Sequence, residues 1–211
     1  MKKITLLFVS VVTISTMSFA QVKFGFKAGI QSTSFRIHVE EGDTKATVDG
    51  TRAGFLLGGT AEIGLSEHFA FQPNLLFFMK NGYVSLGSSK SNIFTIDIPL
   101  NFVYTEGGFF VGAGPNFSYG ISGKLKPFDG GDPDEDAYKG EGGADPLLKR
   151  FEFGINALMG YKFSGGFTIS SNFTPGLTDI LNTDEEGTTV HNNAFGISFG
   201  YTFGGKAKAK K

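Results

Sequence analysis

A two-residue alternation of apolar and polar side chains recurs eight times along this chain and limits the folds open to it. The stretch 151–163 reads FEFGINALMGYKF, with mostly aromatic and aliphatic residues at odd positions and mostly Gly, Asn and charged residues at even positions. Such alternation predicts β-strands whose two faces meet different surroundings. The predicted strands cover about 22–31, 52–63, 69–80, 93–104, 109–121, 150–163, 167–177 and 193–203.

The contents of the two faces indicate which one meets lipid. Nearly all phenylalanines after residue 20 lie in the apolar register, the exceptions being Phe35, Phe78, Phe110 and Phe128. A soluble barrel would have to expose this aromatic face and bury the charged one, which is unfavourable on both counts. We therefore predict that the aromatic face meets lipid and that the other register fills the lumen with glycine and a charge network. Its members are Lys23, Lys27, Arg52, Glu62, Lys80, Asp97, Arg150, Glu152 and Lys162.

Long and short connections alternate between these strands. The turns LSEHF, TEGG and SGG are tight, whereas segments 36–50, 81–92, 124–148 and 178–191 are long and together carry a formal charge of −9. Short turns on one rim, long loops on the other and an even strand count are typical of bacterial outer-membrane barrels. The sequence therefore predicts an all-β fold, an eight-stranded antiparallel transmembrane up-and-down β-barrel with both termini in the periplasm.

The two ends of the chain depart from the strand pattern. Lys2, Lys3, an apolar run and a small-residue exit at Ala20 have the layout of a secretory signal peptide. That run is too short to span a membrane as a helix. We expect a cleavable signal peptide at 1–20, the barrel at 21–203 and a lysine-rich C-terminal tail at 204–211.

Composition excludes two classes of protein. The chain has no cysteine, so it forms no disulfide. Without the signal peptide it carries 17 basic and 20 acidic residues, a net charge of −3, which is unlike a basic nucleic-acid binder. We expect no nucleic acid among its partners.

No catalytic or metal-binding constellation stands out from the sequence. His38 and His191 lie in long connections and His68 in a short turn on the opposite rim, so no nucleophile, histidine and carboxylate are brought together. The acidic connection offers hard oxygen ligands suited to calcium, but their spacing does not match an EF-hand. We expect no enzyme, no cofactor and no metal site, and interpret this connection as a solvated surface loop. Its carboxylates are Asp129, Asp132, Asp134, Glu135, Asp136, Glu141 and Asp145.

Four prolines lie inside predicted strands, where each removes a donor from the hydrogen-bond ladder. They are Pro73, Pro99, Pro115 and Pro175. Bulges are the usual accommodation of such prolines, but the sequence itself shows none.

The strand motifs VKFGFKAGIQ, FAFQPNLLFFMKNG, FTIDIPLNFVY, FFVGAGPNFSYGI, SNFTPGLTDI and FGISFGYTF, taken in order, resemble those of the PorT-like outer-membrane β-barrel family. The resemblance covers essentially all of 22–203. It implies an eight-stranded barrel similar to the OmpA and OmpX architecture, delivered to the outer membrane by the barrel-assembly machinery. It also suggests a partner in a secretion apparatus.

Three functions remain open at this point. The first is a non-enzymatic outer-membrane anchor, set among lipid and lipopolysaccharide, whose long loops contact envelope or secretion partners. The second is a narrow channel or carrier for small solutes or lipophiles, and the third is an envelope enzyme. Conductance would separate the second from the first, because an eight-stranded barrel is narrow enough for side chains to fill.

Overall fold

The computed structural model describes residues 22–39, 47–84, 89–126, 135–139, 146, 148–182 and 188–204. The expected signal peptide and the tail from residue 205 onward lie outside the described residues. No helix in the part of the chain that the structure describes is long and apolar enough to cross a membrane.

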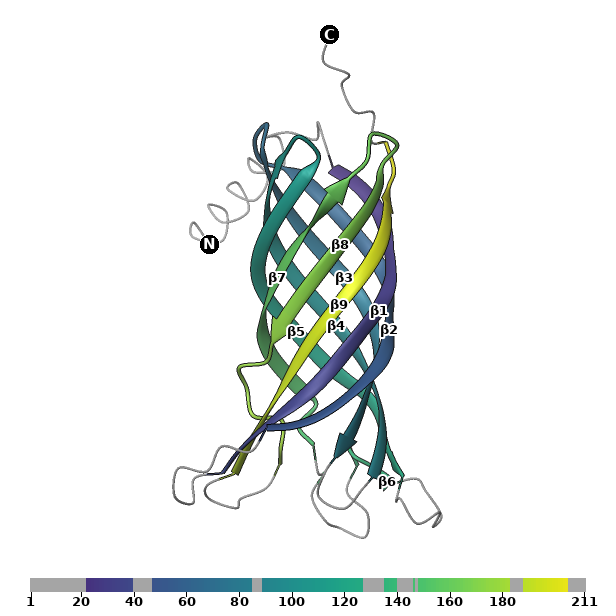
Figure 1. The fold of residues 1–211 in the computed structure, drawn as a ribbon, viewed down its shortest axis with the longest axis vertical. Helices are drawn as coiled ribbons and strands as arrows, with labels where there is room; N and C mark the ends of the chain where they lie inside the picture. Colours follow the sequence, from purple (N-terminus) through teal and green to yellow (C-terminus); the bar gives the residue numbers. More distant parts are fainter. Residues whose placement is uncertain are drawn as a thin grey trace, which may run out of the picture.

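Eight long strands form a closed antiparallel barrel (Figure 1). Each strand pairs with its neighbour in the chain, and the last strand pairs with the first. The prediction of an eight-stranded up-and-down barrel is thereby confirmed. The strands are β1 (Val22–Val39), β2 (Thr47–Gly64), β3 (Phe69–Val84), β4 (Ser89–Glu106), β5 (Phe109–Lys126), β7 (Phe151–Lys162), β8 (Phe167–Pro175) and β9 (Thr188–Thr202), and the two-residue β6 (Glu135–Asp136) pairs with the end of β5.

Six of these strands continue farther toward the long connections than the alternation predicted. The β1–β9 ladder runs to Val39↔Thr188, and the β3–β4 ladder closes at Val84↔Ser89. The predicted long connections 36–50 and 81–92 are therefore partly strand, and the predicted bounds were wrong at this end. Backbone pairing therefore continues beyond the stretches whose alternation indicated the strands.

The prolines are accommodated without the bulges that are usual for proline in a strand. Register shifts occur only between Thr33 and Phe35 and between Phe94 and Thr95 among the described ladders. Pro73, Pro99 and Pro115 keep the register of their ladders, with unpaired positions beside them. A missing N–H removes a bond toward one neighbouring strand only, so a local gap suffices and no extra residue is needed.

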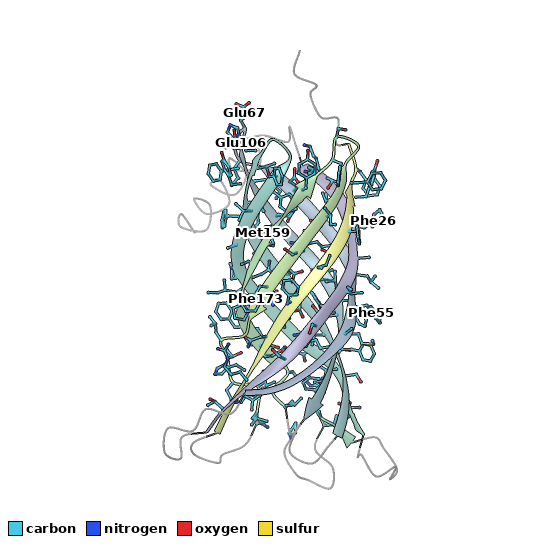
Figure 2. All side chains as sticks on the ribbon, viewed as in Figure 1. Phe26, Phe55, Glu67, Glu106, Met159 and Phe173 are labelled. Carbon is cyan, nitrogen blue, oxygen red and sulfur yellow. The ribbon has the colours of Figure 1, made fainter. Side chains whose placement is uncertain are left out.

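The two strand faces point as the sequence predicted (Figure 2). In β9, Phe199 is 64% exposed on the outside, whereas the adjacent Ser198 is 0% exposed in the lumen. The lumen also holds a small apolar cluster that the polar register did not predict, formed by Leu56, Leu76 and Phe78. The interior is narrow: a Cβ added at Gly114 would collide with the Leu100 carbonyl oxygen of the neighbouring strand.

Candidate functional site in the barrel lumen

The lumen near the short turns contains one carboxylate between two ammonium groups. Glu62 on β2 lies 3.9 Å from Lys23 Nζ on β1 and 2.5 Å from Lys162 Nζ on β7. Lys23 and Glu62 are partners in the β1–β2 ladder, whereas Lys162 is 100 positions from Glu62 and is brought to it by barrel closure. This group carries a net formal charge of +1.

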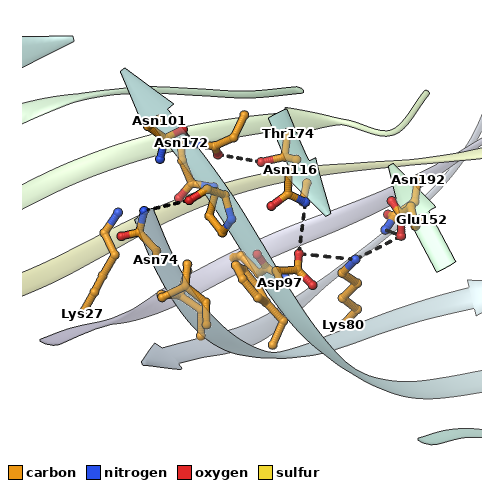
Figure 3. A pocket seen from close by; sticks show the side chains of 17 residues that line it. Lys27, Asn74, Lys80, Asp97, Asn101, Asn116, Glu152, Asn172, Thr174 and Asn192 are labelled. Carbon is orange, nitrogen blue, oxygen red and sulfur yellow. Dashed lines mark hydrogen bonds and ion pairs between the residues drawn. The ribbon is translucent and has the colours of Figure 1, made fainter. Parts of the chain in front are cut away.

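A second ionic group lies deeper in the barrel (Figure 3). Lys80 Nζ is 3.2 Å from Glu152 Oε2 and 3.8 Å from Asp97 Oδ2, and the Lys80 side chain is only 5% exposed. Thr95 donates a hydrogen bond of 2.6 Å to Asp97, and Asn192 donates one of 3.3 Å to Glu152. Such donors lower the cost of burying carboxylates away from water. This group carries a net formal charge of −1.

Of the other predicted lumen charges, the two whose side chains the structure describes, Arg150 and Lys27, join neither group. Arg150, at the long-connection end or mouth, donates to the carbonyl oxygens of Gly120 and Tyr138, both at 3.0 Å. Within the described residues, Lys27 has no hydrogen-bond or ion-pair partner. Arg52 pairs with Thr33 in the β1–β2 ladder, and its side chain lies outside the description. Among the described side chains, the paired lumen charges therefore form two separate ionic groups instead of one stack.

Amide side chains fill the space between the two ionic groups. Asn156 donates to Asn101 at 2.9 Å, Thr174 donates to Asn156 at 2.8 Å, and Asn74 donates to the Pro99 carbonyl oxygen at 3.3 Å. The sequence analysis did not predict this layer of hydrogen-bonded amides, although its members lie in the inward register. Hydrogen bonds of these amide side chains therefore join three or more strands across the interior of the barrel.

Three small cavities divide the free space of the lumen. The central and mouth cavities measure about 20 Å³ each, and the cavity near the short turns, the turn-end cavity, measures about 30 Å³. Lys80 and Glu152 line both the central and the mouth cavity, so their ion pair stands between the two. Lys27 and Asn74 line both the central and the turn-end cavity. Each cavity has room for one or two molecules of water size.

Parts of two long connections fold back across the mouth. Residues 135–139, 148–150 and 176–182 make up this mouth lid. Backbone bonds hold it together: Leu148 N donates to the Ala137 carbonyl oxygen at 2.8 Å, and Lys149 N to that of Ile180 at 2.9 Å. Its apolar side chains pack against the strand ends in a buried cluster. The cluster comprises Ile93, Ala137, Tyr138, Leu148, Ile180 and Val190.

The acidic connection was interpreted as a solvated surface loop along its whole length. This is wrong for residues 135–139, which belong to the mouth lid. Asp136 accepts hydrogen bonds from the backbone N–H groups of Gly123 and Tyr138, at 3.3 Å and 3.1 Å, and thereby orders this segment at the mouth. Glu135 and Asp136 are the two of its seven carboxylates that fall within the described residues. No group of three potential metal ligands occurs in the described part of the chain.

Two titratable side chains of the lid have shifted pKa values. Burial raises the pKa of Tyr138 to about 12 despite the nearby Lys80 and Arg150 cations, so its hydroxyl is neutral at physiological pH. Partial burial acts to raise the pKa of Asp179, but N–H donors from Val190 and Leu181, together with Lys149, outweigh it and hold that pKa below its usual range. Asp179 is therefore ionised at neutral pH and anchors the lid to β9.

His68 lies on the opposite rim from the other two histidines, as the sequence predicted, whereas His38 and His191 are two register positions apart on the paired strands β1 and β9. His68 Nδ1 lies 3.2 Å from the Thr105 carbonyl oxygen in a short turn, whereas His191 belongs to β9 near the mouth. His38 lies in β1, and its side chain is outside the description.

A scan against family models finds a match for this barrel. Residues 19–182 match the outer membrane protein beta-barrel domain. The chain belongs to this family. A search of curated proteins gives no match. Membership places the protein in the outer membrane of Gram-negative type, where short turns face the periplasm and long connections face the exterior. The mouth lid accordingly lies on the outer side.

Several outer-membrane proteins of known structure are similar to this chain, although their sequence identity to it is low. Ail of Yersinia pestis is 12% identical with a TM-score of 0.47, covering 87% of this chain and 99% of its own. Neisserial surface protein A is 10% identical with a TM-score of 0.49 and the same coverage. OprG of Pseudomonas aeruginosa is 17% identical with a TM-score of 0.46, covering 86% of this chain and 95% of its own.

Replacing Gly120 with alanine is expected to displace the lid. A Cβ at this position would overlap the Tyr138 ring, which packs on Gly120 inside the mouth. We expect faster protease cleavage within 135–150 in intact cells, because the ring must leave its place. Gly59→Ala is the matched control, since a Cβ there meets nothing within 4 Å. Equal cleavage of the two variants would show that the Tyr138 contact does not hold the lid.

Proposed function

We propose that this member of the beta-barrel family is a non-enzymatic outer-membrane anchor with a closed lumen, whose long external connections carry its contacts. The observation that carries the proposal is the division of the lumen into three cavities of about 20 to 30 Å³. A conducting path needs a continuous column of water, and cavities of this size each have room for only one or two water molecules.

Three barriers lie in series along the barrel. The turn-end and central cavities are separated at Lys27 and Asn74, the central and mouth cavities at the Lys80–Glu152 pair, and the mouth is covered by Tyr138. Opening the second barrier would separate a buried ion pair, which is costly because the freed charges remain in a low-dielectric space. A rigid, filled barrel suits anchoring better than transport.

The external connections supply the proposed contact surface. Their formal charge of −9 favours partners or counter-ions of positive charge, including divalent cations shared with lipopolysaccharide phosphates. The PorT-like motifs of the sequence support a secretion or envelope protein as the partner. Photo-crosslinking from Lys139, whose side chain is 73% exposed in the third long connection, would identify it, with Glu67 in a short turn as the control site.

The wild-type protein is expected to be nearly non-conducting in planar bilayers. Tyr138→Ala should remain non-conducting as well, because it removes one barrier and leaves the Lys80–Glu152 and Lys27–Asn74 barriers in place. Stable, large single-channel currents from the wild type would contradict the anchor proposal. They would favour the rival function, a narrow channel for small solutes or lipophiles.

A further inference from the structure

Lys27 is an inward-facing cation on β1 for which the described residues provide no partner. Figure 3 shows its side chain beside Asn74, with no interaction drawn to it. Every other lumen lysine of the described strands, namely Lys23, Lys80 and Lys162, lies within 4.0 Å of a carboxylate. An ammonium group in a low-dielectric interior is costly unless an anion compensates it.

The charges around the two cavities next to Lys27 show where such an anion is favoured. The central cavity is lined by Lys27 and Lys80 and by the carboxylates Asp97 and Glu152, so its lining is neutral. The turn-end cavity is lined by Lys27 and Lys162 and by one carboxylate, so its lining has a net charge of +1. That carboxylate, Glu62, already has Lys23 as a second cation. The turn-end cavity is therefore the electropositive one.

Hydroxyl donors complete the lining of the turn-end cavity. Thr60, Thr105, Thr168 and Thr202 contribute side chains to it. The Thr60 Oγ1 atom is buried and has no hydrogen-bond partner. A buried hydroxyl without a partner carries a free-energy penalty that a ligand at this place would remove.

The volume of this cavity limits the ligand to a small ion. About 30 Å³ has room for one or two groups of water size, which suits a halide ion. We propose that the turn-end cavity is a chloride-binding site, in which Lys27 and Lys162 supply the charge and the Thr60 hydroxyl supplies a hydrogen bond. The bound ion neutralises Lys27 and stabilises the closed barrel.

Thermal unfolding of the full-length folded barrel in detergent micelles tests the site. We compare sodium chloride with sodium gluconate at equal ionic strength, because gluconate is too large for the cavity. The wild-type midpoint is expected to rise by about 2–4 °C in chloride and to saturate with its concentration. Lys27→Met should lose this dependence. Lys149→Met, which removes a lysine 46% exposed at the mouth, should keep it.

Bromide provides a second measurement that does not depend on a folded variant. Crystals of the wild-type protein soaked in sodium bromide are expected to show an anomalous peak within hydrogen-bond distance of Lys27 Nζ. Such a peak supports the site even if Lys27→Met does not fold. Equal wild-type midpoints in the two salts, or a lumen without a bromide peak, would overturn the proposal. Neither result bears on conductance, so this site and the anchor function stand or fall separately.

Discussion

Replacing Lys80 with methionine is expected to lower the free energy of unfolding by about 3–5 kcal/mol. Among the described residues, Lys80 is the ammonium group within 4.0 Å of both Asp97 and Glu152. Methionine keeps most of the side-chain volume and removes the charge, so the buried Asp97 and the half-buried Glu152 lose their counter-charge. Reversible urea unfolding in lipid bilayers, followed by circular dichroism, would measure the difference.

Two further variants separate lost charge pairing from lost packing. The triple variant Lys80→Met, Asp97→Asn, Glu152→Gln removes all three charges and should recover most of the loss, because neutral groups of similar shape are cheap to bury. Lys149→Met breaks the exposed Lys149–Asp179 pair and should cost at most about 1 kcal/mol. A Lys80→Met variant as stable as Lys149→Met would mean that the central ionic group contributes little.

Replacing Phe173 with arginine is expected to destabilise the barrel by about 2–4 kcal/mol, through contact with lipid. Phe173 is 45% exposed on the outward face of β8, and Figure 2 places it about half-way along the barrel. A charged side chain there must lie in hydrocarbon or distort the bilayer to reach water.

The same substitution at Phe203 is the matched control for this depth effect. Phe203 is 54% exposed beyond the end of β9, at the short-turn end of the barrel. Phe203→Arg should cost about 0–1 kcal/mol, because its charge reaches the membrane interface. The measurement is again reversible unfolding in bilayers. Similar losses at the two positions would place the apolar band elsewhere on the barrel.

The barrel and its facing were predictable from sequence because lipid imposes a simple rule on every strand. In a bilayer all backbone groups must be paired within a closed sheet, so outward side chains are apolar and inward ones are not. This rule acts residue by residue, and Phe199 beside Ser198 in β9 obeys it as predicted. The sequence also indicated which charges lie inside, because Lys80, Asp97 and Glu152 share the inward register.

Contacts between distant segments were decided only by the tertiary structure. Lys80 and Glu152 are 72 positions apart, and nothing in either strand's alternation shows that they pair, whereas Lys27 has no partner among the residues that the structure describes. The lid depends likewise on a Tyr138 ring meeting Gly120 across the mouth. Alternation reports the face on which a residue lies, whereas stagger between strands and the folding of loops determine which inward residues meet. Those depend on the whole closed barrel, and no local stretch of sequence contains them.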